Sequence, residues 1–281
     1  MTMERAVFIP DLDRLPPPYE QYDRLYLGSE FCAWRLPGNH ELHEALAAAD
    51  LRNMAFSLVT PFLDEPGLAR TMALVQALPH DLSIEVIAND LGLIEALRAA
   101  GWQGTLVAGR LLARQRRGPG FQAFGEIPPE AAEALRGSAL DSPAFVELLG
   151  SRYGVRRFEL DDLVQGVAVP ALPEGVRLSL YRPWLLVTAT RNCPWISDGR
   201  AWRREGGCPR PCKGRALRLV PVADGRTGDQ TPCIPLSQRG EEGVSSCPLV
   251  LGGCAQFLEH RSDAPPPAGV DRIVWQPEIP A

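Results

Sequence analysis

Cysteines are the residues of this chain best suited to chemistry, and most of them lie close together. There are seven cysteines in 281 residues, and only Cys32 falls within the first 190. An odd number of cysteines argues against a complete disulfide framework. Clustered thiols in a reducing compartment point first to a bound metal. The six later cysteines are Cys193, Cys208, Cys212, Cys233, Cys247 and Cys254.

The pair Cys208 and Cys212 has the sharpest pattern. The two residues are separated by Pro-Arg-Pro and flanked by Gly-Gly and Lys-Gly, so both sulfurs can turn toward one ion or cluster. Glycine allows close backbone approach, and proline restricts the turn. Cys193 lies upstream within reach through one loop. These three thiolates leave room for a fourth ligand, which either zinc or a four-iron cluster usually takes.

Cys32 is the candidate for that fourth ligand. It follows the strand-like run of residues 24–28, and Cys193 likewise follows an apolar run that ends near Thr190. The carboxyl ends of parallel strands in a barrel meet on one face. We therefore expect Cys32 and Cys193 to lie together, although they are far apart in the sequence.

The elements that must position these cysteines alternate along the chain. Short apolar runs predict strands, and segments with helical period predict helices between them. This alternation predicts an α/β fold, a TIM-like (β/α) barrel that is either complete or incomplete. An open doubly wound sheet is the alternative, but no glycine-rich phosphate turn follows the first strand. Predicted strands are 6–10, 24–28, 54–60, 83–88, 105–109, 156–160 and 176–181; predicted helices are 40–52, 65–78, 91–100, 129–136 and 142–153.

Two parts of the chain differ in composition. Residues 1–190 are expected to form the barrel body, and residues 191–281 form an irregular region rich in Cys, Gly and Pro. Such a region buries little apolar surface by itself, so we expect it to bind the metal and to pack on the barrel. Its first part, residues 191–218, holds eight basic and two acidic residues, which an anionic substrate, an acidic partner or RNA could use.

Overall composition excludes several classes of protein. A hydrophobic fraction of 45% and a charged fraction of 22% argue against a disordered chain. The net charge of −5 provides no global basic field, so we do not expect a nucleic-acid partner. No apolar run approaches the length of about 18 residues that a membrane span needs. The first residues lack the layout of a secretory signal, which predicts a cytoplasmic protein.

Several fragments together resemble one known family. They are Tyr26-Leu27-Gly28-x-Glu30-x-Cys32, Asn89-Asp90-Leu91-Gly92, Val107-Ala108-Gly109, and Arg191-x-Cys193 followed by the Cys-x₃-Cys pair. They resemble the collagenase-like peptidase family (peptidase family U thirty-two), and within it the UbiV-like branch. The resemblance implies a [4Fe-4S] cluster held by Cys32, Cys193, Cys208 and Cys212. Zinc is the alternative that the cysteine pattern alone leaves open. The resemblance gives no counterpart for Cys233, Cys247 or Cys254, which we expect to be small buried side chains outside the site.

The same resemblance implies a function. Members of that branch take part in oxygen-independent hydroxylation during ubiquinone biosynthesis, together with a UbiU-like subunit. We therefore expect a heterodimer that acts on a small aromatic or prenylated quinone precursor. A non-catalytic subunit that relays electrons or has a structural role is a second candidate, because no catalytic dyad is readable. An RNA-base hydroxylation factor is a third candidate, and a peptidase is a fourth.

The peptidase candidate has little support in the residues. The Gly-Ser-x-Cys signature of the peptidase branch is absent, and residues 181–185 instead read Tyr-Arg-Pro-Trp-Leu. The chain also lacks the His-Glu-x-x-His and Gly-x-Ser-x-Gly motifs.

Further polar and aromatic side chains could serve the site or only the fold. Polar residues near the predicted strand ends are candidates for ligand contacts, although Asp90 equally suits a helix cap. They are Glu30, Asn89, Asp90, Arg110, Glu159, Asp161, Asp162 and Arg182. His40 and His43 have i, i+3 spacing, which suits a metal pair or a solvated first helical turn. Trp184, Trp195 and Trp202 could line an apolar pocket for a ring substrate or simply pack.

Overall fold

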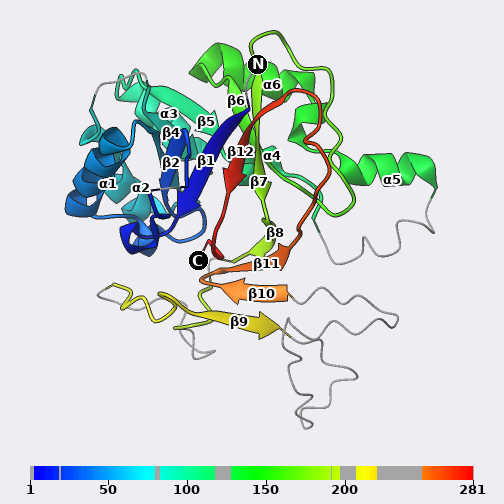
Figure 1. Cartoon of the computed structure of the whole chain (residues 1–281). Helices are drawn as coiled ribbons and strands as arrows, with labels where there is room; N and C mark the ends of the chain where they lie inside the picture. Colours follow the sequence, from blue (N-terminus) through cyan, green and yellow to red (C-terminus); the bar gives the residue numbers. More distant parts are fainter. Residues whose placement is uncertain are drawn as a thin grey trace, which may run out of the picture.

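Eight parallel strands close into a barrel in the computed structural model of this protein (Figure 1). The structure describes residues 3–18, 20–79, 83–117, 128–190, 192–196, 207–219 and 249–280. Neighbouring strands follow the order β1-β12-β7-β6-β5-β4-β3-β2 around the barrel. The predicted TIM-like barrel is therefore confirmed, and the open doubly wound sheet is wrong. The strands are β1 (Glu4–Ile9), β2 (Arg24–Gly28), β3 (Ala55–Thr60), β4 (Glu85–Ala88), β5 (Thr105–Ala108), β6 (Arg157–Asp161), β7 (Arg177–Arg182) and β12 (Val270–Trp275).

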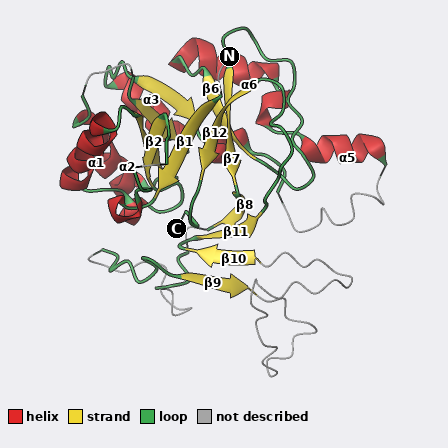
Figure 2. Cartoon of the chain, viewed as in Figure 1, coloured by secondary structure: helices red, strands yellow, loops and turns green. Residues whose placement is uncertain are grey.

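Helices connect most of these strands and cover the outside of the barrel (Figure 2). They begin where the sequence provides caps: the Asp90 carboxylate accepts a hydrogen bond from the backbone N–H of Leu93, and Ser142 caps the helix that begins at Pro143. The α-helices are α1 (Asn39–Leu51), α2 (Glu65–Gln76), α3 (Leu91–Ala99), α4 (Arg110–Ala113), α5 (Pro129–Arg136) and α6 (Pro143–Tyr153). Short 3₁₀ helices in the described part of the chain are η1 (Leu12–Arg14), η2 (Ala33–Arg35) and η4 (Ala139–Asp141). No helix of the described residues is long and apolar enough to cross a membrane.

A second, antiparallel sheet lies beyond the carboxyl ends of the barrel strands (Figure 1). Its strands are β8 (Trp184–Ala189), β9 (Ala216–Leu219), β10 (Leu249–Gly252) and β11 (Ala255–Glu259), in the order β8-β11-β10-β9. Strand β8 follows directly after β7, so the small sheet is continuous with the barrel at this point. The region predicted to be irregular therefore contains a regular sheet.

The eighth barrel strand comes from the far end of that same region. Strand β12 pairs with β1 on one side and with β7 on the other, and Arg272 lies beside Glu4. Residues 1–190 thus supply seven of the eight barrel strands and do not form the barrel alone. The predicted boundary at residue 190 separates β12 from the strands that it joins, so the barrel draws on both predicted parts of the chain.

The inside of the barrel is filled by aromatic, aliphatic and charged side chains. Phe8, Tyr26 and Tyr181 contact one another, with ring centroids 6.2 to 6.4 Å apart. Gly28 allows β2 to approach β3 closely, because its φ is +134° and an added Cβ would lie 2.1 Å from the Val59 carbonyl oxygen. The barrel is therefore a packed core, as in other barrels of this kind.

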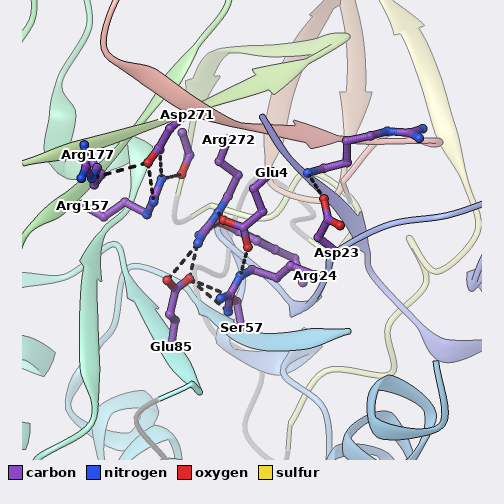
Figure 3. A network of polar contacts seen from close by, with 12 residues as sticks. Glu4, Asp23, Arg24, Ser57, Glu85, Arg157, Arg177, Asp271 and Arg272 are labelled. Carbon is purple, nitrogen blue, oxygen red and sulfur yellow. Dashed lines mark hydrogen bonds and ion pairs between the residues drawn. The ribbon is translucent and has the colours of Figure 1, made fainter. Parts of the chain in front are cut away.

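A network of ion pairs closes the amino end of the barrel (Figure 3). Both terminal nitrogens of Arg272 donate to the Glu85 carboxylate, at 2.7 and 3.0 Å, and its Nε donates to Glu4 at 2.7 Å. Arg24 also pairs with Glu4, at 2.7 Å. Burial alone would raise the pKa of Glu85, but the charge of Arg272, together with its hydrogen bonds, outweighs burial and lowers that pKa to about 2. This end of a barrel usually serves stability rather than catalysis.

Candidate metal centre at the carboxyl end of the barrel

The four predicted ligands all lie at the carboxyl end of the barrel or on the segments that cover it. Cys32 follows β2 and begins the short helix η2, where its backbone N–H donates to the Ser29 hydroxyl at 3.3 Å. Cys193 follows β8, and its carbonyl accepts a hydrogen bond from the backbone N–H of Ile196 at 3.3 Å, which closes a turn. Cys32 thus follows a parallel barrel strand, but Cys193 follows a strand of the antiparallel sheet, so the expectation that both cysteines end parallel barrel strands is wrong for Cys193.

The Cys208–Cys212 segment packs against the segment that carries Cys32. The Arg210 guanidinium donates to the Leu36 carbonyl at 3.3 Å, and a Cβ added at Gly207 would contact the Trp34 ring at 3.4 Å. Arg35 Nη1 lies 3.9 Å from the sulfur of Cys212. These contacts link the Cys-x₃-Cys pair to η2, directly after Cys32.

A fifth cysteine joins the site, although the sequence pattern places it outside. Cys254 is buried, as expected, but its thiol shares hydrogen bonds with the thiols of both Cys32 and Cys193. The charges of Cys32 and Cys193 also act on the Cys212 thiol. The signal that could have found Cys254 is its place in a hairpin: two short apolar runs flank the pair Gly253-Cys254, a pattern typical of a two-residue turn.

Proton sharing sets the electrostatics of these thiols. The hydrogen bond with Cys254 lowers the pKa of Cys32 to about 7 and that of Cys193 to about 6. Backbone N–H groups of Trp195 and Ile196 further favour the Cys193 thiolate. The pKa of Cys254 is raised, chiefly by the same hydrogen bonds, so Cys254 keeps its proton. Two sulfurs are thus prepared to be thiolates, the form that binds metal.

Positive charge lies beside the cysteines. Arg35 is buried and pairs with Asp11 at 3.5 Å, while its guanidinium also contacts Cys212. Lys213 pairs with the same carboxylate at 3.1 Å. Burial raises the pKa of the Cys212 thiol, and the charge of Arg35 opposes that effect. Cationic groups here would offset the negative charge of a thiolate-bound metal.

The donor set suits a metal or cluster that binds thiolates. All five described cysteines are free of disulfides. Zinc in structural sites and iron–sulfur clusters both take four cysteine thiolates. The described residues contain no group of three or more His, Cys, Asp or Glu side chains already arranged around an ion position. The thiols therefore lie together and interact with one another through hydrogen bonds. A bound metal would take the place of the protons that these hydrogen bonds share.

Beside the cysteines, a buried ion-pair cluster fills the mouth of the barrel. Arg110 donates to Glu30 and, at 2.6 Å, to Asp161, and all three side chains are fully buried. Arg117 adds a second cation, 2.8 Å from Asp161. The positions of Arg110, Glu30 and Asp161 at strand ends predict that they surround an active site, but they pair with one another instead of facing a cavity.

Glu159 lies deeper in the barrel, between two tyrosines. The hydroxyls of Tyr26 and Tyr181 donate to its carboxylate at 2.9 and 2.6 Å. Burial raises the pKa of Glu159 to about 8. Its full burial beneath the Arg110 cluster keeps this carboxyl group away from any substrate at the mouth.

The other four predicted polar residues have roles in the fold. The side chain of Asn89 joins the ends of β3 and α4, because it donates to the Thr60 carbonyl at 3.0 Å and accepts from the Leu111 N–H at 3.0 Å. Asp90 caps α3, and Asp162 pairs with Arg182 at 2.6 Å.

The described histidines of α1 and the tryptophans Trp184 and Trp195 contact neighbouring parts of the fold. His40 pairs with Glu44 at 3.1 Å, and His43 contacts the Asn39 carbonyl at 2.6 Å, so each stays within the first turns of α1. Trp184 packs near Phe257 in the core of the small sheet, and Trp195 lies under the Arg215 guanidinium. Arg191, Trp202, Cys233 and Cys247 lie outside the described residues.

Cavities lie at both ends of the described barrel. One of about 350 Å³ lies at the amino end, among Arg98, Arg157 and Arg177. The other, of about 170 Å³, lies beside the cysteines and is lined in part by Asp11, Arg35 and Arg215.

Comparison with known proteins adds one structural match. No protein family model and no curated protein matches this chain. Among solved structures, the U32 peptidase Mk0906 matches over 99% of this chain and 93% of its own, with 15% sequence identity and a TM-score of 0.41. At this TM-score the match adds nothing to the fold assignment, which rests on the strand pairing of the barrel.

Proposed function

We propose that this protein holds a [4Fe-4S] cluster at the carboxyl end of its barrel and takes part in oxygen-independent hydroxylation in ubiquinone biosynthesis. The observation that carries the metal proposal is the gathering of free thiols from segments far apart in the sequence. Support for the hydroxylation comes from the resemblance of the cysteine-bearing fragments to the UbiV-like branch. That resemblance implies Cys32, Cys193, Cys208 and Cys212 as ligands, a UbiU-like partner and a quinone precursor as substrate.

Metal content is the first test. Protein purified without oxygen should be brown and contain about four irons and four sulfides per chain. Replacing Cys32 by alanine should remove most of the iron, whereas loss of a buried cysteine for packing reasons alone would cost only about 1 kcal/mol and leave iron unchanged. Colourless protein with one zinc per chain would refute the cluster and leave a thiolate zinc site.

The hydroxylation is tested in cells grown without oxygen. A strain that lacks this protein should accumulate under-hydroxylated quinone precursors, measured by mass spectrometry. The wild-type chain should restore the quinone, and the Cys193→Ala variant should not. Normal quinone content in the deletion strain would contradict this function.

The buried ion pairs at the barrel mouth favour a second candidate, a subunit that relays electrons. Arg110, Glu30 and Asp161 have no exposed surface, so a substrate cannot enter the barrel between them. In that case the partner would hold the substrate, and this chain would supply electrons from the cluster. A partner that hydroxylates alone when given a chemical reductant would support the relay, whereas a strict need for this chain under the same conditions would contradict it.

A further inference from the structure

We propose that the cavity at the amino end of the barrel binds a small phosphate-bearing ligand. The volume of the cavity, about 350 Å³, lies within the range of sites for small molecules. Glu85 is the one carboxylate among the described residues that line it, whereas four arginines do so: Arg98, Arg156, Arg157 and Arg177. The inference does not depend on the metal centre, because the cysteines lie at the opposite end of the barrel.

The four arginines reach the cavity from neighbouring parts of the barrel wall. Arg98 lies near the end of α3, Arg156 and Arg157 lie where β6 begins, and Arg177 begins β7. Arg157 and Arg177 are partners in the register of the two parallel strands. Two like charges this close repel each other unless an anion lies between them.

One carboxylate serves both of these paired arginines (Figure 3). Asp271 accepts hydrogen bonds from Arg157 at 2.6 and 3.3 Å, and its second oxygen lies 3.6 Å from Nε of Arg177. In the described part of the chain, the terminal nitrogens of Arg177 donate to no other group. Asp271 therefore compensates only one of the two positive charges.

Glu85 does not supply the missing negative charge. Its carboxylate accepts hydrogen bonds from Arg272 at 2.7 and 3.0 Å and lies 3.4 Å from Arg24. Glu4 pairs with the same two arginines, so two carboxylates and two arginines balance one another in this network. The charge of the arginines around the cavity remains uncompensated.

Arg98 and Arg156 have no carboxylate partner among the described residues. Arg98 donates to the carbonyls of Tyr153 and Trp102, at 2.8 and 2.6 Å, which holds its guanidinium in place. Its Nη2 donates to no described group and lies 3.4 Å from where a Cβ would stand on Gly154, a residue of the cavity wall. Burial lowers the pKa of Arg98, because the charge has lost solvent and gained no anion. The fixed guanidinium therefore has a free side toward the cavity.

This arrangement fits a phosphate group better than a carboxylate. A guanidinium presents paired N–H donors that match the oxygens of either group. A carboxylate has two oxygens and one charge, and Asp271 shows that a single arginine already occupies both oxygens. A terminal phosphate has three oxygens and nearly two negative charges at neutral pH, so it can accept from several guanidinium groups at once. The enclosed shape of the site favours a small molecule over a long polyanion.

The test is isothermal titration calorimetry of the full chain with pyrophosphate at constant ionic strength. Wild-type protein should bind one pyrophosphate per chain. Arg156→Gln and Arg177→Gln should each weaken binding about tenfold, the effect of losing one charge-assisted hydrogen bond. The matched control is Arg152→Gln, which removes the same charge from an exposed ion pair with Glu95 outside the cavity and should bind as the wild type does.

Folding does not confuse this test, because Arg156 is exposed and has no polar partner among the described residues. Melting curves without ligand check each variant. Absence of pyrophosphate binding at millimolar concentration would overturn the proposal, and so would equal weakening by Arg152→Gln, which would reveal unspecific attraction between charges.

Two further ligands distinguish the chemistry of the site. Citrate, which carries carboxylates only, should bind more weakly than pyrophosphate. Tighter binding of citrate would overturn the assignment to phosphate. A single-stranded RNA oligomer that binds when pyrophosphate does not would show that this end of the barrel is a nucleic-acid surface and would also overturn the proposal.

Discussion

Replacing Arg272 by methionine should strongly destabilise the protein, because it breaks a buried charge network without opening a large cavity. The Arg272 side chain is 2% exposed, and it binds Glu85, Glu4 and the Tyr26 hydroxyl. Removing one partner of a buried ion pair costs about 3–5 kcal/mol. Glu85 keeps Arg24 at 3.4 Å and the Ser57 hydroxyl at 2.9 Å, so we expect the lower end, about 3 kcal/mol.

The effect should depend on pH in a defined direction. Glu85 has a folded pKa of about 2 against an ordinary value of 4.5, so it contributes stability above pH 4.5 that is lost as the pH falls toward 2. Without Arg272 its pKa lies nearer the ordinary value, and the variant has less of this contribution to lose. The difference in unfolding free energy between the two proteins should therefore shrink below pH 4.5, by up to about 1.4 kcal/mol per pH unit.

Urea unfolding followed by tryptophan fluorescence measures both effects. The matched control is Arg261→Met, which removes an exposed ion pair with Glu259 and should cost no more than about 0.5 kcal/mol. The double variant Arg272→Met/Glu85→Gln should recover part of the loss, because no unpaired carboxylate remains. Equal costs for the two arginine variants at pH 7, or a difference that does not change with acidity, would refute this reasoning.

Three further changes test other parts of the structure. The folded pKa of Glu159 is about 8 and its ordinary value is 4.5, so between these pH values the folded state binds a proton that the unfolded state has lost. Wild-type stability should therefore fall as the pH rises from 4.5 to 8. Glu159→Gln should remove this pH dependence of the melting temperature. Gly28→Ala should cost several kcal/mol in urea unfolding, since the new Cβ would collide with the Val59 carbonyl, whereas Gly38→Ala, in open space, should cost little. Arg35→Met should keep the iron but shift the reduction potential of the cluster to more negative values in a redox titration, because a cation beside Cys212 is lost; an unchanged potential would place Arg35 outside the influence of the cluster.

Much of the barrel is readable from the sequence because its strands and helices have strong local patterns. The runs around Phe56 and Val86 are rich in branched and aromatic residues, and Asp90 and Ser142 mark helix starts. Strand β12 escapes such reading. Its buried face carries the charged Arg272 between Val270 and Val274, which interrupts the apolar pattern, and its partners β1 and β7 lie far away along the chain. Only closure of the barrel shows that this segment is a core strand.

The site residues also fall into those that the sequence predicts and those that it does not. Cys32 could be placed at the carboxyl end of a parallel barrel strand, although the run before Cys193 forms β8 of the antiparallel sheet and not a barrel strand. Cys254 could not, because it depends on an antiparallel hairpin outside the alternating pattern. The roles of Arg110 and Glu159 also depend on packing, since a charged residue at a strand end can face either a ligand or another charge.

The late position of β12 has a consequence for synthesis on the ribosome. Until residues 270–275 emerge, β1 and β7 are two unpaired strand edges, which can pair with other chains. Every cysteine of the site has by then been translated, so the metal-binding segments are complete before the barrel can close. Once β12 is in place, its pairing with β1 and β7 also holds the late part of the chain to the early part. A single cut between β9 and β10 would leave barrel strands on both pieces, and the pieces would stay joined by the pairing of β12 with β1 and β7.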